Sequence, residues 1–127
     1  MNVAINERIL FNHLGYSLIT SSGVCKHVNG KFLTNCFKSG LDQSSCEAFC
    51  TSQTSCVGYM FQASSSKCRL FPSESKCPSE FDLKLAQTLA ASKNDLAAKP
   101  APRFVCYGKN SGKILELDWQ TYKDFEI

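Results

Sequence analysis

Cysteine is the residue of this sequence whose number and spacing most directly indicate chemistry. The chain has 127 residues and eight cysteines. They are Cys25, Cys36, Cys46, Cys50, Cys56, Cys68, Cys77 and Cys106. An even number at this density is typical of secreted domains, in which disulfides hold a small core together. The composition therefore predicts four disulfides and an oxidising compartment, although eight cysteines allow roughly a hundred pairings and spacing alone selects none of them.

Two of these cysteines lie four residues apart in a segment that is expected to be helical. Ser44 and Glu47 have the spacing of a capping box, in which each side chain bonds the backbone N–H of the other residue at a helix start. This motif predicts a short helix over about residues 45–52. Cys46, Phe49 and Cys50 would then project from one face of the helix and meet the core.

A β-hairpin is expected directly after this helix. Residues 56–61 are rich in strand formers with Tyr59 and Phe61 in period two, and residues 68–71 form a second strand after a polar turn. Tyr59 and Phe61 are expected to be core residues, because the helix must cover their strand. A disulfide requires Cα atoms within roughly 7 Å. The short separation suits a bridge from Cys50 to Cys56, which leaves Cys46 for Cys68.

The remainder of the chain adds one more helix and one more strand to the expected fold. Phe81, Leu85 and Leu89 recur every four residues and predict a helix that ends near residue 94. The prolines at 100 and 102 break it, and residues 103–107 form a last strand. The expected fold is α+β, a small disulfide-rich domain with an antiparallel sheet packed against one cysteine-bearing helix.

The cysteines also define the expected domain boundaries. Residues 1–24 contain none and are interpreted as an N-terminal leader or an extra strand, residues 25–108 as the domain, and residues 109–127 as a tail that packs on it. The tail holds the single tryptophan, Trp119. The first residues lack an uninterrupted apolar segment, so we expect a secreted protein or an extracellular part of a larger one whose signal peptide is absent from this chain.

Metal binding and catalysis are the competing chemical interpretations. Cys46 and Cys50 with His27 are potential zinc ligands, but structural zinc sites usually have a second closely spaced cysteine pair. His13 is the other histidine, a paired cysteine set leaves no free thiol, and no nucleophile elbow or phosphate loop occurs. We therefore expect no enzyme, metal or cofactor. The carboxylates that remain are interpreted as helix-start residues: Asp42, Glu47, Glu80 and Asp82.

The charge distribution is mild. The formal net charge is +3 without a basic cluster, which argues against a nucleic-acid partner. No apolar run approaches the ~20 residues of a membrane span, so no direct membrane insertion is expected. Lys67 and Arg69 flank Cys68, and Lys38 precedes the helix; if the three converge, they form a site for a sulfate or carboxylate. The alternative is scattered solubilising charge.

The central cysteine pattern resembles the PAN/Apple family. It consists of Cys46-x3-Cys50 on a helix, Cys56 leading an aromatic strand, and Cys68-Arg69-Leu70, followed by a closing strand at residues 104–107. The resemblance covers about residues 25–108. It implies a bridge from Cys25 to Cys106 between the first and last strands, after which Cys36 and Cys77 pair by elimination.

The resemblance also implies a function. PAN/Apple modules mediate adhesion and recognition outside cells, so the chain is expected to bind an extracellular protein or glycan, including an anionic glycan, with an oligomeric state that the sequence does not indicate. The alternative is a stand-alone secreted effector such as a toxin or protease inhibitor. An inhibitor should present a rigid exposed loop, for which Lys67 and Lys76 beside cysteines are poor candidates.

Overall fold

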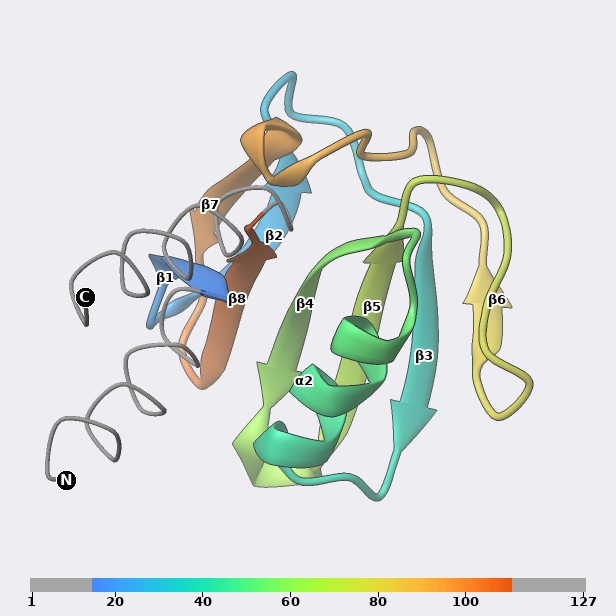
Figure 1. Cartoon of the computed structure of the whole chain (residues 1–127). Helices are drawn as coiled ribbons and strands as arrows, with labels where there is room; N and C mark the ends of the chain where they lie inside the picture. The colour runs from blue at the N-terminus through green and yellow to red at the C-terminus, as the bar shows by residue number, and fades with distance from the viewer. Residues whose placement is uncertain (1–14, 111–127) are drawn as a thin grey trace, which may run out of the picture.

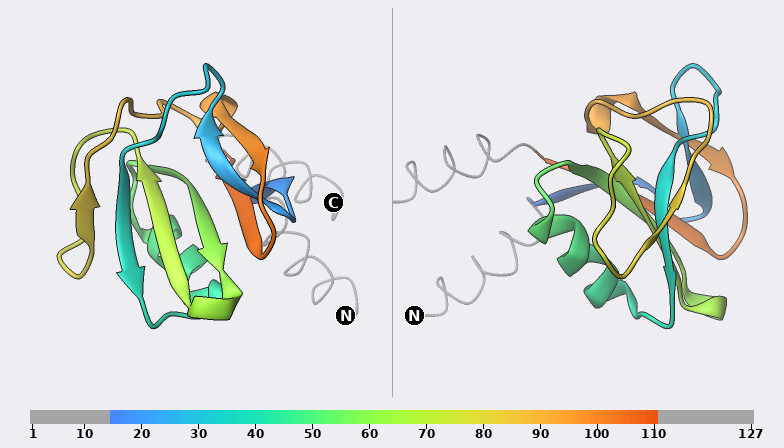
Figure 2. Two further views of the ribbon diagram at one scale, coloured as in Figure 1. Left: turned by 180° about the vertical axis from the view of Figure 1, so that it is seen from behind. Right: turned by 90° about the vertical axis from the view of Figure 1, so that its right-hand side faces the viewer.

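An antiparallel sheet of six strands carries the helix on one face and a two-stranded ribbon on the other (Figure 1, Figure 2). The structure is a computed structural model that describes residues 15–110. In sheet order the strands are β1 (Tyr16–Thr20), β8 (Phe104–Lys109), β4 (Cys56–Gln62), β5 (Lys67–Pro72), β3 (Asn35–Ser39) and β6 (Asp82–Lys84). The ribbon consists of β2 (Gly23–His27) and β7 (Leu96–Pro100), and the helix is α2 (Gln43–Ser52). Two short 3-10 turns cover Ala63–Ser65 and Lys93–Asp95.

The two faces of the central hairpin belong to two separate cores. The hairpin of β4 and β5 was expected from the sequence and is confirmed. Tyr59 and Phe61 are buried toward α2, as the alternation predicted, and Met60 is buried toward the ribbon. At Gly58 a Cβ would lie 2.5 Å from both Leu96 of β7 and the carbonyl oxygen of Tyr107. The absence of a side chain there lets the ribbon pack closely on the sheet.

Helix α2 starts at a different cap from the one the sequence predicted. The Asp42 carboxylate accepts the Ser45 N–H at 2.8 Å and therefore caps the helix. Hydrogen bonds from the Ser45 backbone N–H and side chain lower the pKa of Asp42. The proposed capping box was wrong because Glu47 is engaged elsewhere: its carboxylate accepts a hydrogen bond of 2.9 Å from the buried Tyr59 hydroxyl.

The other end of α2 is held by a lysine from the last strand. The Lys109 ammonium group donates to the carbonyl oxygens of Cys50 and Gln53, each at 2.9 Å. The last carbonyls of a helix lack intrahelical donors and carry partial negative charge, so a cation here satisfies both needs. Burial lowers the pKa of Lys109. This contact joins the helix to β8 across the sheet.

The second predicted helix is wrong. Its segment contains β6 and an extended stretch that crosses beside the chain at Phe32 (Figure 1). Phe81 is buried whereas Leu85 is 72% exposed, so the four-residue repeat does not mark one buried face. The Thr88 N–H bonds to the Phe32 carbonyl, and the Thr88 carbonyl accepts from Thr34. Long-range backbone pairing thus takes the place of the i to i−4 bonds that a helix needs.

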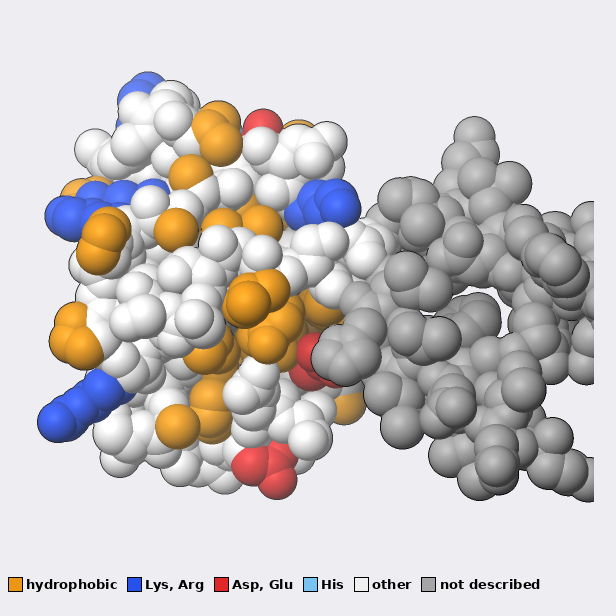
Figure 3. All heavy atoms as spheres, turned by 90° about the vertical axis from the view of Figure 1, so that its left-hand side faces the viewer, with side chains coloured by type: hydrophobic (Ala, Val, Ile, Leu, Met, Phe, Trp, Pro, Cys, Tyr) orange, Lys and Arg blue, Asp and Glu red, His pale blue; other side chains and the backbone are white. Residues whose placement is uncertain are grey.

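The segments next to the domain's ends also form strands. Tyr16–Thr20, within the stretch interpreted as a leader or an extra strand, pairs with β8 as β1. Residues 96–100, where prolines were expected to break a helix, form β7. The face on the β1 side displays apolar side chains at its surface (Figure 3), and Leu18 of β1 is 53% exposed. The tail from residue 111, including Trp119, lies outside the described residues.

Four disulfides cross-link the domain. They are Cys25–Cys106, Cys36–Cys77, Cys46–Cys68 and Cys50–Cys56. These are the four pairs expected from the spacing, the resemblance and elimination. Two of them attach α2 to the hairpin, and the first attaches the ribbon to β8. A framework of four disulfides indicates an extracellular or secreted domain. Within residues 15–110, no helix is long and apolar enough to cross a membrane.

Candidate binding groove

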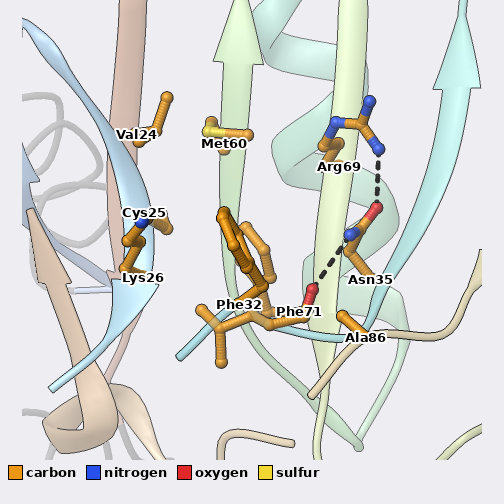
Figure 4. A pocket seen from close by; sticks show the side chains of 10 residues that line it. Val24, Cys25, Lys26, Phe32, Asn35, Met60, Arg69, Phe71 and Ala86 are labelled. Atoms are coloured by element: carbon orange, nitrogen blue, oxygen red, sulfur yellow. Dashed lines mark hydrogen bonds between the residues drawn. The ribbon is translucent and has the colours of Figure 1, made fainter. Parts of the chain in front are cut away.

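A groove runs along the ribbon face of the sheet, between β2 and the half of the sheet that the ribbon leaves open (Figure 4). The ribbon packs on β8, β4 and β1, whereas β5, β3 and β6 extend beyond it. Two hollows, of about 400 Å³ and about 260 Å³, share Val24, Met60 and Arg69 in their walls. We refer to the two together as the groove.

The floor of the groove is apolar. Leu33, Met60 and Phe71 are buried members of the core beneath the ribbon and line the larger hollow. Phe32 stands at its rim with 59% of its surface exposed. A ligand seated in the hollow would cover this ring, and the burial of its apolar surface would then add to the free energy of binding.

Arg69 occupies the sheet-side wall in a fixed orientation. Its Nη1 donates to Asn35 Oδ1 at 2.8 Å, and Asn35 Nδ2 donates in turn to the Leu33 carbonyl at 3.0 Å (Figure 4). The guanidinium carbon lies 4.6 Å from the centre of the Phe37 ring. Arginine has five N–H donors, and a single one has an acceptor among the described residues. Burial of the half-buried side chain lowers the pKa of Arg69.

Lys26 provides a second cation on the opposite wall. Its ammonium nitrogen lies 4.2 Å from the centre of the Phe32 ring, a cation–π geometry. Its pKa is lowered by desolvation and then by the nearby charge of Lys99. Lys67 adds a further cation in the wall of the smaller hollow. The two walls therefore present positive charge across an apolar floor.

These cations lack anionic partners in the described part of the chain. The one His, Lys or Arg contact with a carboxylate found there joins His27 to Asp95 at 4.0 Å and involves none of the three cations. Asp82 is the carboxylate whose strand position, opposite Phe37, places it on the same face of the sheet, and it forms no ion pair with a described residue. The groove is thus positively charged without internal neutralisation by residues 15–110.

The three cations proposed from the sequence do not converge. Lys38 lies opposite Cys68 in the register of β3 and β5, and Cys68 points toward the helix to reach Cys46. Directly opposed residues of an antiparallel pair share a face, so Lys38 belongs to the helix face. Lys67 and Arg69 alternate with Cys68 and belong to the groove face. The sequence thus identified two of the groove's cations, and Lys38 was wrongly grouped with them.

Other residues singled out from the sequence have structural surroundings. Cys46 and Cys50, the cysteines of the zinc alternative, are both in disulfides, and residues 15–110 contain no cluster of three ligand side chains for a metal. Asp42 is a helix-start residue as expected. Glu80 and Asp82 are not, since residue 80 lies in a turn and residue 82 begins β6. His13 lies outside the described residues.

The tyrosines on the helix face form a polar network inside the first core. Tyr59 is fully buried, and its hydroxyl also accepts a hydrogen bond from the Gln43 amide. The Tyr16 hydroxyl lies 2.8 Å from Thr51 Oγ1. Burial raises the pKa of Tyr16 to about 12 and raises that of Tyr59 further. These groups stabilise the contact between helix and sheet and lie on the face opposite the groove.

Sequence reasoning missed three groove residues, Lys26, Phe32 and Asn35. They belong to β2, to the loop after it and to β3, a region in which the resemblance implied a strand at Cys25 but the residues themselves predicted no element. The sequence shows only that a lysine, a phenylalanine and an asparagine lie close to Cys25 and Cys36. Such a combination of residues is too common to indicate a binding site. The groove forms only when β2 pairs with β7, about 70 residues away along the chain.

Comparison with known proteins identifies no relative of this chain: no family model, no curated protein and no solved structure matches it.

Proposed function

We propose that this chain is an extracellular recognition module on a PAN/Apple-like frame, and that it binds an anionic protein or carbohydrate ligand in the groove. The observation that carries the proposal is Arg69. Its guanidinium group is half-buried, oriented by Asn35 and stacked on Phe37, and it has no carboxylate partner among the described residues. A desolvated arginine without a counter-ion is costly to the free protein, and an incoming carboxylate or sulfate would offset that cost through a bidentate contact.

The frame supports the extracellular part of the proposal. Four disulfides suit an oxidising environment and hold a small domain rigid. The Cys25–Cys106 bridge fixes the ribbon, and with it the Lys26 wall, against the sheet that carries Arg69. A rigid groove loses little conformational entropy on binding, which favours recognition.

A charge-matched pair of variants tests the proposal. Arg69→Gln removes one positive charge from the groove face, and Lys38→Gln removes one from the helix face. The probes are heparin, polysialic acid and polyglutamate, which present sulfate or carboxylate on a glycan or a peptide. Binding is measured by biolayer interferometry at several salt concentrations, because contacts with an anionic polymer weaken as salt rises.

We expect at least one of the three polymers to bind. Its affinity should fall at least about tenfold in Arg69→Gln, since that variant removes a charge-assisted contact, and should change little in Lys38→Gln. The proposal is overturned if no polymer and no acidic peptide binds, or if the two variants lose affinity equally, because equal loss would mean that binding depends on net charge alone.

A further inference from the structure

The free edge of β2 forms part of the groove wall. β2 has β7 as its one neighbour in the described structure, so half of its backbone groups point away from the ribbon. The hydrogen bonds identify which half. Val28 N–H bonds to Asp95 O and Ala101 N–H bonds to Ser22 O. These bonds place the even-numbered residues from 22 to 28 in the hydrogen-bonded pairs of the ladder.

Cys25 therefore directs its backbone N–H and C=O away from β7. In the register Cys25 faces Ala98 in a pair without hydrogen bonds. Cys25 lines the larger hollow, and the edge of β2 faces β4 and β5 across it (Figure 4). No described residue bonds to these two backbone groups. The outward groups of His27 are already used, since its N–H bonds to the Lys31 carbonyl and its carbonyl accepts from the Gly30 N–H. At Cys25 the wall thus offers one backbone donor and one acceptor of the free edge of β2.

One ligand could contact three features of the larger hollow: the strand edge at Cys25, the apolar floor and the oriented guanidinium of Arg69. We propose that the groove takes an extended peptide that pairs with β2 and carries a carboxylate beside an apolar side chain. The apolar side chain enters the hollow over Met60 and Phe71, and the carboxylate meets Arg69. This inference rests on the proposed function, because it uses the same groove.

The same features favour a peptide over a glycan as the occupant. Strand addition supplies main-chain hydrogen bonds, and pockets for alternate side chains supply specificity. A sulfated or carboxylated polysaccharide has no main chain of amide groups in strand geometry to match the edge of β2. It also has no compact apolar side chain for a hollow of about 400 Å³ whose floor is Leu33, Met60 and Phe71. The carboxylate can come from an acidic side chain or from a chain end, and the two sources share this chemistry.

An array of synthetic peptides tests the inference on the full chain. Each probe is an acetylated hexapeptide with one Asp or Glu and one Leu, Val or Phe at varied spacing, made with a free or an amidated C-terminus. The best binder is then measured by fluorescence anisotropy. It is compared with versions in which the acid becomes its amide, the apolar residue becomes serine, or alternate backbone amides are N-methylated.

We expect binding that weakens at least about tenfold when either side chain is replaced. N-methylation should abolish binding at one set of alternate amides and have little effect at the other set, because a strand pairs along one edge. If only free-acid peptides bind, the carboxylate is a chain end; if amidated peptides bind equally well, it is a side chain. Either result supports the inference.

Protein variants locate the contact. Asn35 acts as a positioning residue through Arg69, so Asn35→Ala should weaken the peptide about tenfold with an unchanged thermal unfolding midpoint, and Lys38→Gln should have no effect. The inference is overturned if no peptide binds while heparin or polysialic acid binds in an Arg69-dependent way, an outcome that leaves the proposed function standing. It is also overturned if N-methylation is harmless at both sets of amides. If Arg69→Gln changes the binding of no probe, both proposals fail together.

Discussion

The Cys25–Cys106 bridge should contribute more stability than the Cys50–Cys56 bridge, because it closes a much longer segment of chain. The two bridges span sequence separations of 81 and 6 residues. The chain-entropy relation gives about 4.5 kcal/mol for the long loop and about 2 kcal/mol for the short one. The relevant perturbations are the paired variants Cys25→Ala/Cys106→Ala and Cys50→Ala/Cys56→Ala.

Packing losses are closely matched between the two variants. All four cysteines are at most 6% exposed, so each variant removes two buried sulfur atoms from a core. The difference between the variants therefore isolates the loop term, which is about 2 kcal/mol. Only the first variant releases the ribbon, so it alone should also weaken the binding of a groove ligand.

The assay is urea unfolding followed by far-UV circular dichroism at 25 °C, with the free energy of unfolding extrapolated to water. We expect the Cys25/Cys106 variant to be the less stable of the two by about 2 kcal/mol, or to be unfolded altogether. Equal losses of unfolding free energy, or a larger loss in the Cys50/Cys56 variant, would refute the reasoning that the bridge closing the longer loop contributes more stability.

Three further predictions concern α2 and its contacts. Lys109→Met should lower the free energy of unfolding by about 1–2 kcal/mol, because two carbonyl oxygens at the end of α2 lose a charged donor; urea unfolding should show a smaller change for Lys99→Met on the exposed part of β7. The raised pKa of Tyr16 means that the folded state favours the neutral phenol. The contribution of Tyr16 to the free energy of unfolding is therefore complete below pH 10 and is lost as pH rises toward 12. Tyr16→Phe should remove a tyrosinate absorbance step near pH 12, and an unchanged titration would contradict this assignment. Asp42→Ala should lower the thermal midpoint at pH 7 more than at pH 2. Because the pKa of Asp42 is lower in the folded state, the ionised carboxylate stabilises the fold above the pKa of the unfolded state, and this stabilisation is lost as pH falls. Asp42→Asn should retain much of the cap.

The sequence was informative where local signals and the final fold agree. Alternation around Tyr59 predicted the hairpin. The helix was predicted from a capping box that the structure replaces with an Asp42 cap, and the four-residue spacing of Cys46 and Cys50 then correctly placed both cysteines in the core. Sequence reasoning failed where a local pattern competed with distant pairing. Phe81 and Leu85 have helical spacing, but backbone bonds between Thr88 and the chain at Phe32 keep their segment extended. A periodicity argument has no access to such contacts.

The candidate groove could be predicted only in part for the same reason. Lys67 and Arg69 share a strand, so their shared face follows from alternation alone. Assigning Lys38 to a face of the sheet required the register between β3 and β5, which the sequence does not specify. The opposite wall required the backbone pairing of β2 with β7, two segments of little distinctive composition, and the Cys25–Cys106 bridge that attaches β2 to β8.

The most direct test of the groove uses a methionine as a reporter. The chain has two methionines, and Met60 lies in the floor of both hollows. Labelling with 13C-methyl methionine, with Met60→Leu to assign the signal, gives a probe of the groove itself. The account predicts that the Met60 methyl resonance shifts during titration with an anionic polymer or peptide that binds, and that the shift saturates at the same dissociation constant as binding and is lost in Arg69→Gln. Saturable binding that leaves the Met60 resonance unmoved would contradict the claim that the groove between β2 and β5 is the recognition site.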